Sequence, residues 1–159
     1  MPWTHPIQPV TKSFELTVIE QAGDWRDWSG DAEHIVATVF KVSQHSPDDK
    51  AIALVLSDDA QIRQMNRDFR GKDKPTNVLS FPSDAPDEWG DIIVSEETIR
   101  KEAAEQGKTF HDHFVHMLVH GTLHLLGYDH EIEAEAEEME ALEIDILSEL
   151  GVENPYENG

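Results

Sequence analysis

Three histidines lie within the eleven-residue stretch HGTLHLLGYDH, residues 120–130. In a helix, His120 and His124 would lie one turn apart on the same face, where two imidazole nitrogens can bind one metal ion. Gly127 tolerates the left-handed backbone that ends a helix, so the chain can turn back and bring His130 to the same ion. Three imidazoles and a water would form a catalytic type of zinc centre. The spacing therefore predicts one Zn²⁺ held by His120, His124 and His130.

A purely structural role for these histidines is the alternative. His116, His120 and His124 could form a polar stripe on a buried helix, satisfied by hydrogen bonds. Burying several unpaired imidazoles costs free energy that metal binding offsets, which favours the metal site. His116 is left out of the ligand set, as a core residue or a group behind the metal. The remaining histidines lack this geometry and are predicted to lie at the surface: His5, His34, His45, His111 and His113.

The histidine spacing also resembles the signature of metzincin zinc peptidases. In that signature the residue after the first histidine is a glutamate that acts as general base. Here that position is Gly121. A peptidase is therefore only a minor alternative.

Basic residues gather in one short segment of an acidic chain. Five of the twelve lysines and arginines fall within twelve positions: Arg63, Arg67, Arg70, Lys72 and Lys74. The formal charge of −21 argues against an extended nucleic-acid-binding surface, and residues 131–159 alone carry eleven acidic side chains. Because salt screens surface charges beyond about 8 Å, a local basic segment can still hold a phosphate. The alternative is a solvated acidic surface with one basic loop.

Hydrophobic periodicity and turn residues predict the elements that position these groups. Strands are expected at 14–20, 51–57, 77–81 and 91–95, and helices at about 31–45, 58–71, 95–107, 112–126 and 133–150. The helix at 112–126 is apolar around most of its circumference and should lie in the core, whereas the last helix should turn its glutamates outward. The expected fold is α+β, a mixed, roughly four-stranded sheet packed with about five helices. The metal site would lie at a C-terminal helix and the turn after it.

Length and composition predict one domain. Residues 14–152 should form a single metal-dependent hydrolase domain, with a flexible arm at 1–13 and a short tail at 153–159. The absence of cysteine excludes disulfides, thiolate zinc sites and a cysteine nucleophile. No segment has the pattern of a signal peptide or approaches the ~20 apolar residues that span a bilayer. A cytoplasmic protein without membrane contact is expected.

Two blocks, FRGKDKPTNVLSFP at 69–82 and HGTLHLLGYDH at 120–130, resemble the YbeY family of bacterial ribosome-associated endoribonucleases. GDIIVS, EAAEQGK and the acidic EAEEMEALE helix are similar to that family as well, over roughly residues 50–155. The resemblance implies a single-strand-specific, metal-dependent endoribonuclease in ribosomal RNA maturation, especially of the small-subunit RNA, and in ribosome quality control. It places the three metal histidines on His120, His124 and His130, and the catalytic arginine on Arg70.

These assignments suggest how RNA could be cleaved. Bound zinc can lower the pKa of a water toward about 7 or polarise a phosphoryl oxygen. The guanidinium of Arg70 matches phosphate oxygens, although by spacing alone it could equally be a charge at a helix C-terminus. We expect Arg70 and His120 to act in catalysis, and Arg70, Lys72 and Lys74 to bind the RNA backbone. A solvated loop is the alternative for the two lysines.

Other polar and aromatic residues in these segments receive no firm role. Trp89 and Phe81 could stack on bases, although aromatic residues beside strands more often belong to the core. Asp129 could orient His130 or cap the turn, and is assigned no catalytic role.

The favoured function is thus a zinc-dependent endoribonuclease whose partners are single-stranded ribosomal RNA and the small ribosomal subunit or its proteins, with no DNA expected. The main alternative is a non-catalytic, zinc-containing ribosome-assembly factor whose acidic surface binds a basic ribosomal protein. A metzincin-like peptidase comes last.

Overall fold

The computed structural model describes residues 13–25, 31–129 and 133–156. The predicted arm therefore lies outside the described residues except for Ser13, and so do the last three residues of the predicted tail.

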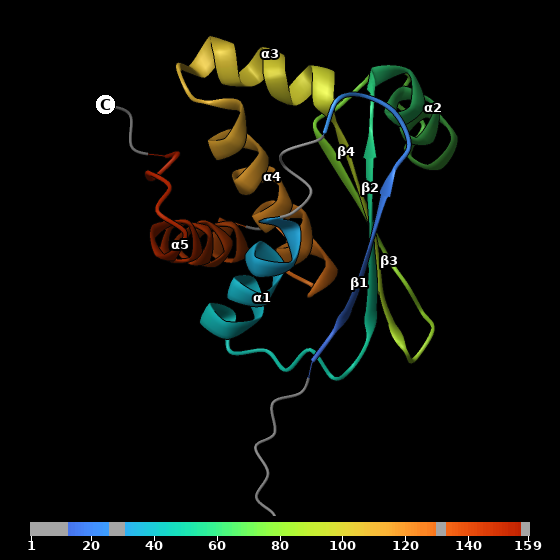
Figure 1. Ribbon diagram of the computed structural model, residues 1–159. Coiled ribbons are helices and arrows are strands. Elements are labelled where there is room, and N and C mark those ends of the chain that lie inside the picture. The colour runs from blue at the N-terminus through green and yellow to red at the C-terminus, as the bar shows by residue number, and fades with distance from the viewer. Residues whose placement is uncertain (1–12, 26–30, 130–132, 157–159) are drawn as a thin grey trace, which may run out of the picture.

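A mixed four-stranded sheet forms the centre of the molecule (Figure 1), in the order β1 (Glu15–Glu20), β2 (Ala51–Ser57), β4 (Glu88–Ser95) and β3 (Val78–Pro82). The first three strands run parallel, and β3 pairs antiparallel with β4 at one edge. Parallel strands require long crossover connections, and the helices after β1 and β2 provide them.

Helices cover both faces of this sheet. In Figure 1, α1 (Ala32–Ser43), α4 (Phe110–Leu125) and α5 (Glu133–Glu149) lie on one side, and α2 (Asp59–Arg70) lies on the other. The helix α3 (Glu96–Gln106) follows β4 directly and leads into α4. These elements confirm the predicted fold, an α+β domain with four strands and five helices. None of the described helices is long and apolar enough to cross a bilayer.

The core confirms that α4 is a central helix. Phe114, Leu118 and Leu123 of α4 are fully buried and pack against apolar residues of α1, α5 and the sheet. A smaller apolar cluster, formed by Ile62, Leu79 and Ile93, holds α2 to the opposite face. The inner strands β2 and β4 are therefore covered on both sides, whereas β1 leaves Ile19 46% exposed.

The strand β4 begins at Glu88, three residues before the predicted start at Asp91. The segment before the predicted strand thus contributes Glu88, Trp89 and Gly90 to the sheet. Gly90 makes this possible: its φ is +140°, and a Cβ atom there would overlap the carbonyl oxygen of Phe81 on β3. Only glycine fits this close approach.

Candidate active site

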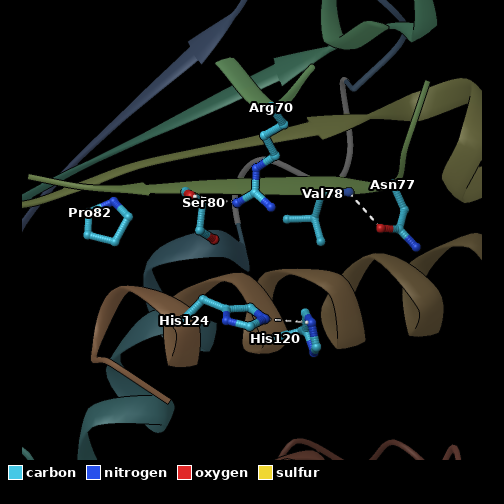
Figure 2. Close-up of a pocket in the computed structure, with 7 residues that line it drawn as sticks. All are labelled: Arg70, Asn77, Val78, Ser80, Pro82, His120 and His124. Carbon is cyan, nitrogen blue, oxygen red and sulfur yellow. Dashed lines mark hydrogen bonds between the residues drawn. The ribbon is translucent and has the colours of Figure 1, made fainter. Parts of the chain in front are cut away.

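A pocket opens between α4 and the edge strand β3 (Figure 2). Its lining combines residues from α2, from β3 and the position before it, and from α4: Arg70, Asn77, Val78, Ser80, Pro82, His120 and His124. Figure 2 shows the guanidinium of Arg70 reaching across β3 toward the two histidines on α4. The two blocks singled out in the sequence therefore form the two sides of one pocket.

The alternation of side chains along β3 explains this arrangement. Val78, Ser80 and Pro82 line the pocket, whereas Leu79 and Phe81 pack in the apolar cluster beneath α2. Since β3 is an edge strand, a side chain from the α2 face can pass around it. Nη2 of Arg70 lies 3.5 Å from the carbonyl oxygen of Ser80.

The end of α2 determines where Arg70 lies. Gly71 adopts a left-handed conformation with φ +69° and ends the helix, and its N–H donates to the carbonyl of Arg67 at 3.1 Å. Asn66 is 2% exposed and holds the following loop through two hydrogen bonds. Its side-chain Nδ2 donates to the carbonyl of Lys74 at 2.9 Å, and its backbone carbonyl accepts from the N–H of Lys72 at 3.2 Å. Asn66 was not predicted from the sequence, although its position four residues after Ile62 places it on the buried face of α2.

The other basic residues of this segment lie outside the pocket. Arg63 forms an ion pair with Asp73 at 2.8 Å, and Arg67 lies 3.4 Å from Asp68. Lys72 and Lys74 are exposed, and neither lines the pocket. Of the five basic residues predicted to form a patch, the structure brings Arg70 alone into the pocket.

His120 and His124 converge as their spacing predicts. Their Nε2 atoms are 3.0 Å apart, and both rings are only partly buried. Two neutral rings can approach this closely when one nitrogen donates a proton to the other, or when both lone pairs face one cation. The donor set therefore suits a metal ion that prefers imidazole nitrogen.

The third predicted ligand, His130, lies outside the described residues. Within the described part of the chain, no group of three or more histidine, aspartate or glutamate side chains is arranged to hold a metal ion. The predicted end of the helix is present: α4 ends at Leu125, and Gly127 has a φ of +100°. The N–H of Tyr128 then donates back to the carbonyl of Leu123 at 3.1 Å.

A buried carboxylate supports the histidines from behind. Glu143 of α5 is 1% exposed, so the prediction that the glutamates of this helix face outward is wrong for this residue. Its oxygens lie 2.8 Å from Nε2 of His116 and 3.2 Å from Nδ1 of His120. Glu143 follows Met139 by four positions and precedes Leu147 by four, so helical spacing could have placed it on the apolar face.

The charge of Glu143 follows from these contacts. Burial alone would raise its pKa, but the hydrogen bonds from His116 and His120 outweigh burial and lower the pKa to about 2. An ionised carboxylate only accepts hydrogen bonds, so Nδ1 of His120 carries a proton. When this ring is neutral, its Nε2 lone pair faces the pocket and His124.

His113 is also buried, at 2% exposure, which contradicts its predicted surface position. Its Nε2 lies 2.8 Å from Oε1 of Glu102, and the same oxygen accepts from Nδ2 of Asn77 at 2.9 Å. Burial lowers the pKa of His113, although Glu102 opposes this effect. His113 of α4 is thus connected to Glu102 of α3 and, through Glu102, to Asn77 just before β3.

Of the other histidines predicted at the surface, His34 is exposed, His45 and His111 are partly buried, and His5 lies outside the described residues.

Gly121 brings α4 close to the sheet. Its carbonyl accepts a hydrogen bond from Oγ of Ser80 at 2.8 Å. A Cβ atom at this position would lie 3.0 Å from Ile92 and 3.1 Å from Val78. A glutamate here would meet strands β3 and β4, so the metzincin arrangement does not fit this fold.

The two aromatic residues considered for base stacking have structural contacts. Nε1 of Trp89 donates to the carbonyl of Pro47 at 2.9 Å, and its ring packs against Phe40. Phe81 faces α2, where its ring lies edge-on to Phe69 with centroids 5.6 Å apart. Neither lines the pocket.

Comparisons with known proteins give a consistent result. Residues 17–151 match the family described as Endoribonuclease YbeY. A protein of that name from Bradyrhizobium sp. is 49% identical, over 87% of this chain and 90% of its own length. Another from Acinetobacter baylyi is 55% identical, over 69% of this chain and 75% of its own length.

Solved structures agree with this result. The solution structure of TM1509 from Thermotoga maritima has a TM-score of 0.59 and 26% identity, and covers 86% of this chain and 91% of its own. The family and the enzyme class predicted from the two sequence blocks are confirmed: the chain belongs to the YbeY family of endoribonucleases.

Proposed function

We propose that this chain is a zinc-dependent endoribonuclease that cleaves single-stranded ribosomal RNA, in maturation of the small-subunit RNA and in ribosome quality control. The observation that carries this proposal is the pocket in which Arg70 faces the converging Nε2 atoms of His120 and His124. The preference for single strands and the ribosomal substrate rest on the family resemblance.

The histidines would form the metal centre. His120 and His124 supply two imidazole nitrogens, and the turn at Gly127 leads the chain toward the third expected ligand, His130. A carboxylate behind a ligating histidine, as Glu143 is behind His120, is a common support in zinc sites. When bound, zinc supplies Lewis acidity and a water that ionises near neutral pH.

Arg70 would hold the phosphate. Its guanidinium is permanently charged and presents a planar set of donors to phosphate oxygens. Placed opposite the histidines, it can orient the scissile phosphate and balance the charge that develops on it during cleavage. Lys72 and Lys74, exposed beside the pocket-lining segment, would contact the backbone of flanking nucleotides.

The remaining assignments follow from this function. Residues 14–152 would form the catalytic domain, and the partners would be the small ribosomal subunit or its proteins. Such a substrate would place the protein in the cytoplasm.

Replacement of Arg70 by alanine tests the catalytic role. We expect Arg70→Ala to lower cleavage of a single-stranded ribosomal RNA fragment by about 100-fold or more, because it removes a charge from the transition state. Zinc content and the circular dichroism spectrum should be unchanged. Arg63→Ala is the matched control, since Arg63 lies on the same helix outside the pocket and should leave cleavage near the wild-type rate.

Two results would count against the proposal. Equal cleavage by wild type and Arg70→Ala would remove the role of Arg70. Absence of cleavage by zinc-loaded wild type on every ribosomal RNA fragment would favour the non-catalytic assembly factor.

A further inference from the structure

A cluster of hydrogen-bonded polar side chains lies behind His120, on the side away from Arg70. His120 lines the catalytic pocket and also a second cavity, which Glu143 of α5 and Tyr156 of the C-terminal segment help to line. His116, one turn before His120 on α4, completes the group. The proposed reaction uses only the pocket side of His120, so this group needs its own explanation.

We propose that Glu143 is a positioning residue which, together with Tyr156, holds the His120 ring in the tautomer whose Nε2 can bind a metal ion. This inference rests on the metal site of the proposed function. It assigns a role to the buried face of α5, which carries Glu143, and to the C-terminal segment, which carries Tyr156.

The hydrogen bonds around Glu143 leave it little freedom. Oε2 accepts from Nε2 of His116 at 2.8 Å, and Oε1 accepts from Nδ1 of His120 at 3.2 Å. The hydroxyl of Tyr156 lies 3.0 Å from Oε2 and 3.2 Å from Oε1, so its proton is shared between the two oxygens. With three donors, the carboxylate is fixed in place. It therefore fixes the orientation of the His120 ring.

The proton positions agree with this role. Nδ1 of His116 is buried and has no hydrogen-bond partner among the described residues. A proton on that atom would be an unsatisfied buried donor, whereas a proton on Nε2 is donated to Glu143. Nε2 of His116, Nδ1 of His120 and the hydroxyl of Tyr156 then all donate to the carboxylate. A cation bound at Nε2 of His120 would balance its charge through the ring.

The C-terminal segment closes the group. After α5, the N–H of Val152 donates to the carbonyl of Leu147 at 2.8 Å, which turns the chain back along the helix. The side chain of Asn154 then accepts from the N–H of Tyr156 at 2.8 Å. Tyr156, at 42% exposure, thus reaches Glu143 from a segment that the sequence suggested was only a tail.

Zinc affinity and histidine tautomers test this inference without any RNA. Titration of purified, metal-free protein with Zn²⁺ against a chelating dye gives the affinity. Correlation of ring nitrogens and protons by ¹⁵N NMR gives the tautomer of His120. Wild type should carry its proton on Nδ1. Glu143→Gln should mix the tautomers and weaken zinc binding 10- to 100-fold, because an amide cannot accept hydrogen bonds at both positions.

Tyr156→Phe should weaken zinc binding several-fold and leave the fold intact, since the lost hydroxyl is partly exposed. Glu137→Gln, an exposed glutamate on the same helix, is the control and should match wild type. Wild-type zinc affinity and an unchanged His120 tautomer in a folded Glu143→Gln protein would overturn the proposal. If Glu143→Gln does not fold, wild-type affinity in Tyr156→Phe would overturn it instead. Loss of RNA cleavage activity in every sample, with these metal effects present, would contradict the proposed function and leave this inference standing.

Discussion

Glu143 favours the ionised form in the folded protein although it is buried. Its pKa is about 2 in the fold, against an ordinary value of 4.5, because hydrogen bonds from His116 and His120 favour the carboxylate. A carboxyl group whose pKa is lowered by folding stabilises the fold above its ordinary pKa. That contribution is lost as the pH falls toward the folded value.

The difference in stability between wild type and Glu143→Gln should therefore depend on pH. The lowered pKa corresponds to a contribution of up to about 3 kcal/mol, present at pH 7 and lost progressively between pH 4.5 and 2. Urea denaturation of both proteins across this range, with a chelator to exclude metal, measures the difference. A difference that stays constant with pH would contradict the role of the carboxylate charge.

The position of a functional residue could be predicted from the sequence when its partner lies one turn away on the same helix. The four-residue separation of His120 and His124 predicted their convergence, which the structure contains. Arg70 required the family resemblance, because its approach to the pocket depends on passing around an edge strand that spacing does not reveal. His113 was misplaced because its partner Glu102 lies on another helix, whereas the four-residue spacing of Glu143 from Met139 did carry a signal for its buried position.

The close packing of α4 against β3 positions the two sides of the pocket. Gly121 permits this approach, and Ser80 hydrogen-bonds to its carbonyl. Alanine is normally favoured over glycine in a helix by about 1 kcal/mol. Here its Cβ would lie 3.0 Å from Ile92 and 3.1 Å from Val78, both in the sheet, so the contacts must open.

We therefore expect Gly121→Ala to lower the free energy of unfolding by about 1–2 kcal/mol, because overpacking outweighs the helix preference. It should also lower RNA cleavage by moving His120 away from Arg70. Urea denaturation and cleavage assays on the same preparation measure both effects. A gain in stability of about 1 kcal/mol would show that the space at Gly121 is not limiting.

Hydrophobic periodicity and turn residues were sufficient to predict, for each described helix and strand, which of the two it is. The early start of β4 was missed because it depends on Gly90 fitting against the backbone of β3, a contact between strands. The strand order β1-β2-β4-β3 is likewise a property of the assembled sheet.

Charge is distributed unevenly over the whole molecule. The basic residues near the pocket come from α2 and the loop after it, whereas α5 and the C-terminal segment carry carboxylates and no lysine or arginine. With a formal charge of −21, the protein should repel RNA over most of its surface. RNA is therefore expected to approach across β3 and the α2 side.

Removal of the two loop lysines tests this direction of approach. Lys72→Gln combined with Lys74→Gln should raise the KM for RNA several-fold and change kcat little, since these side chains would bind backbone phosphate. The effect should shrink as salt is increased. Lys101→Gln, an exposed lysine on α3, is the control and should behave as wild type. An equal rise in KM for each charge removed in the control would show that only net charge matters.

The central claim, that histidines hold a catalytic metal opposite Arg70, is tested most directly by metal analysis and RNA cleavage on the same samples of wild type, His120→Ala, His124→Ala and His130→Ala. We predict about one zinc per wild-type chain, and loss of both metal and cleavage in each variant. Full cleavage by a folded variant that has lost its metal would contradict the account.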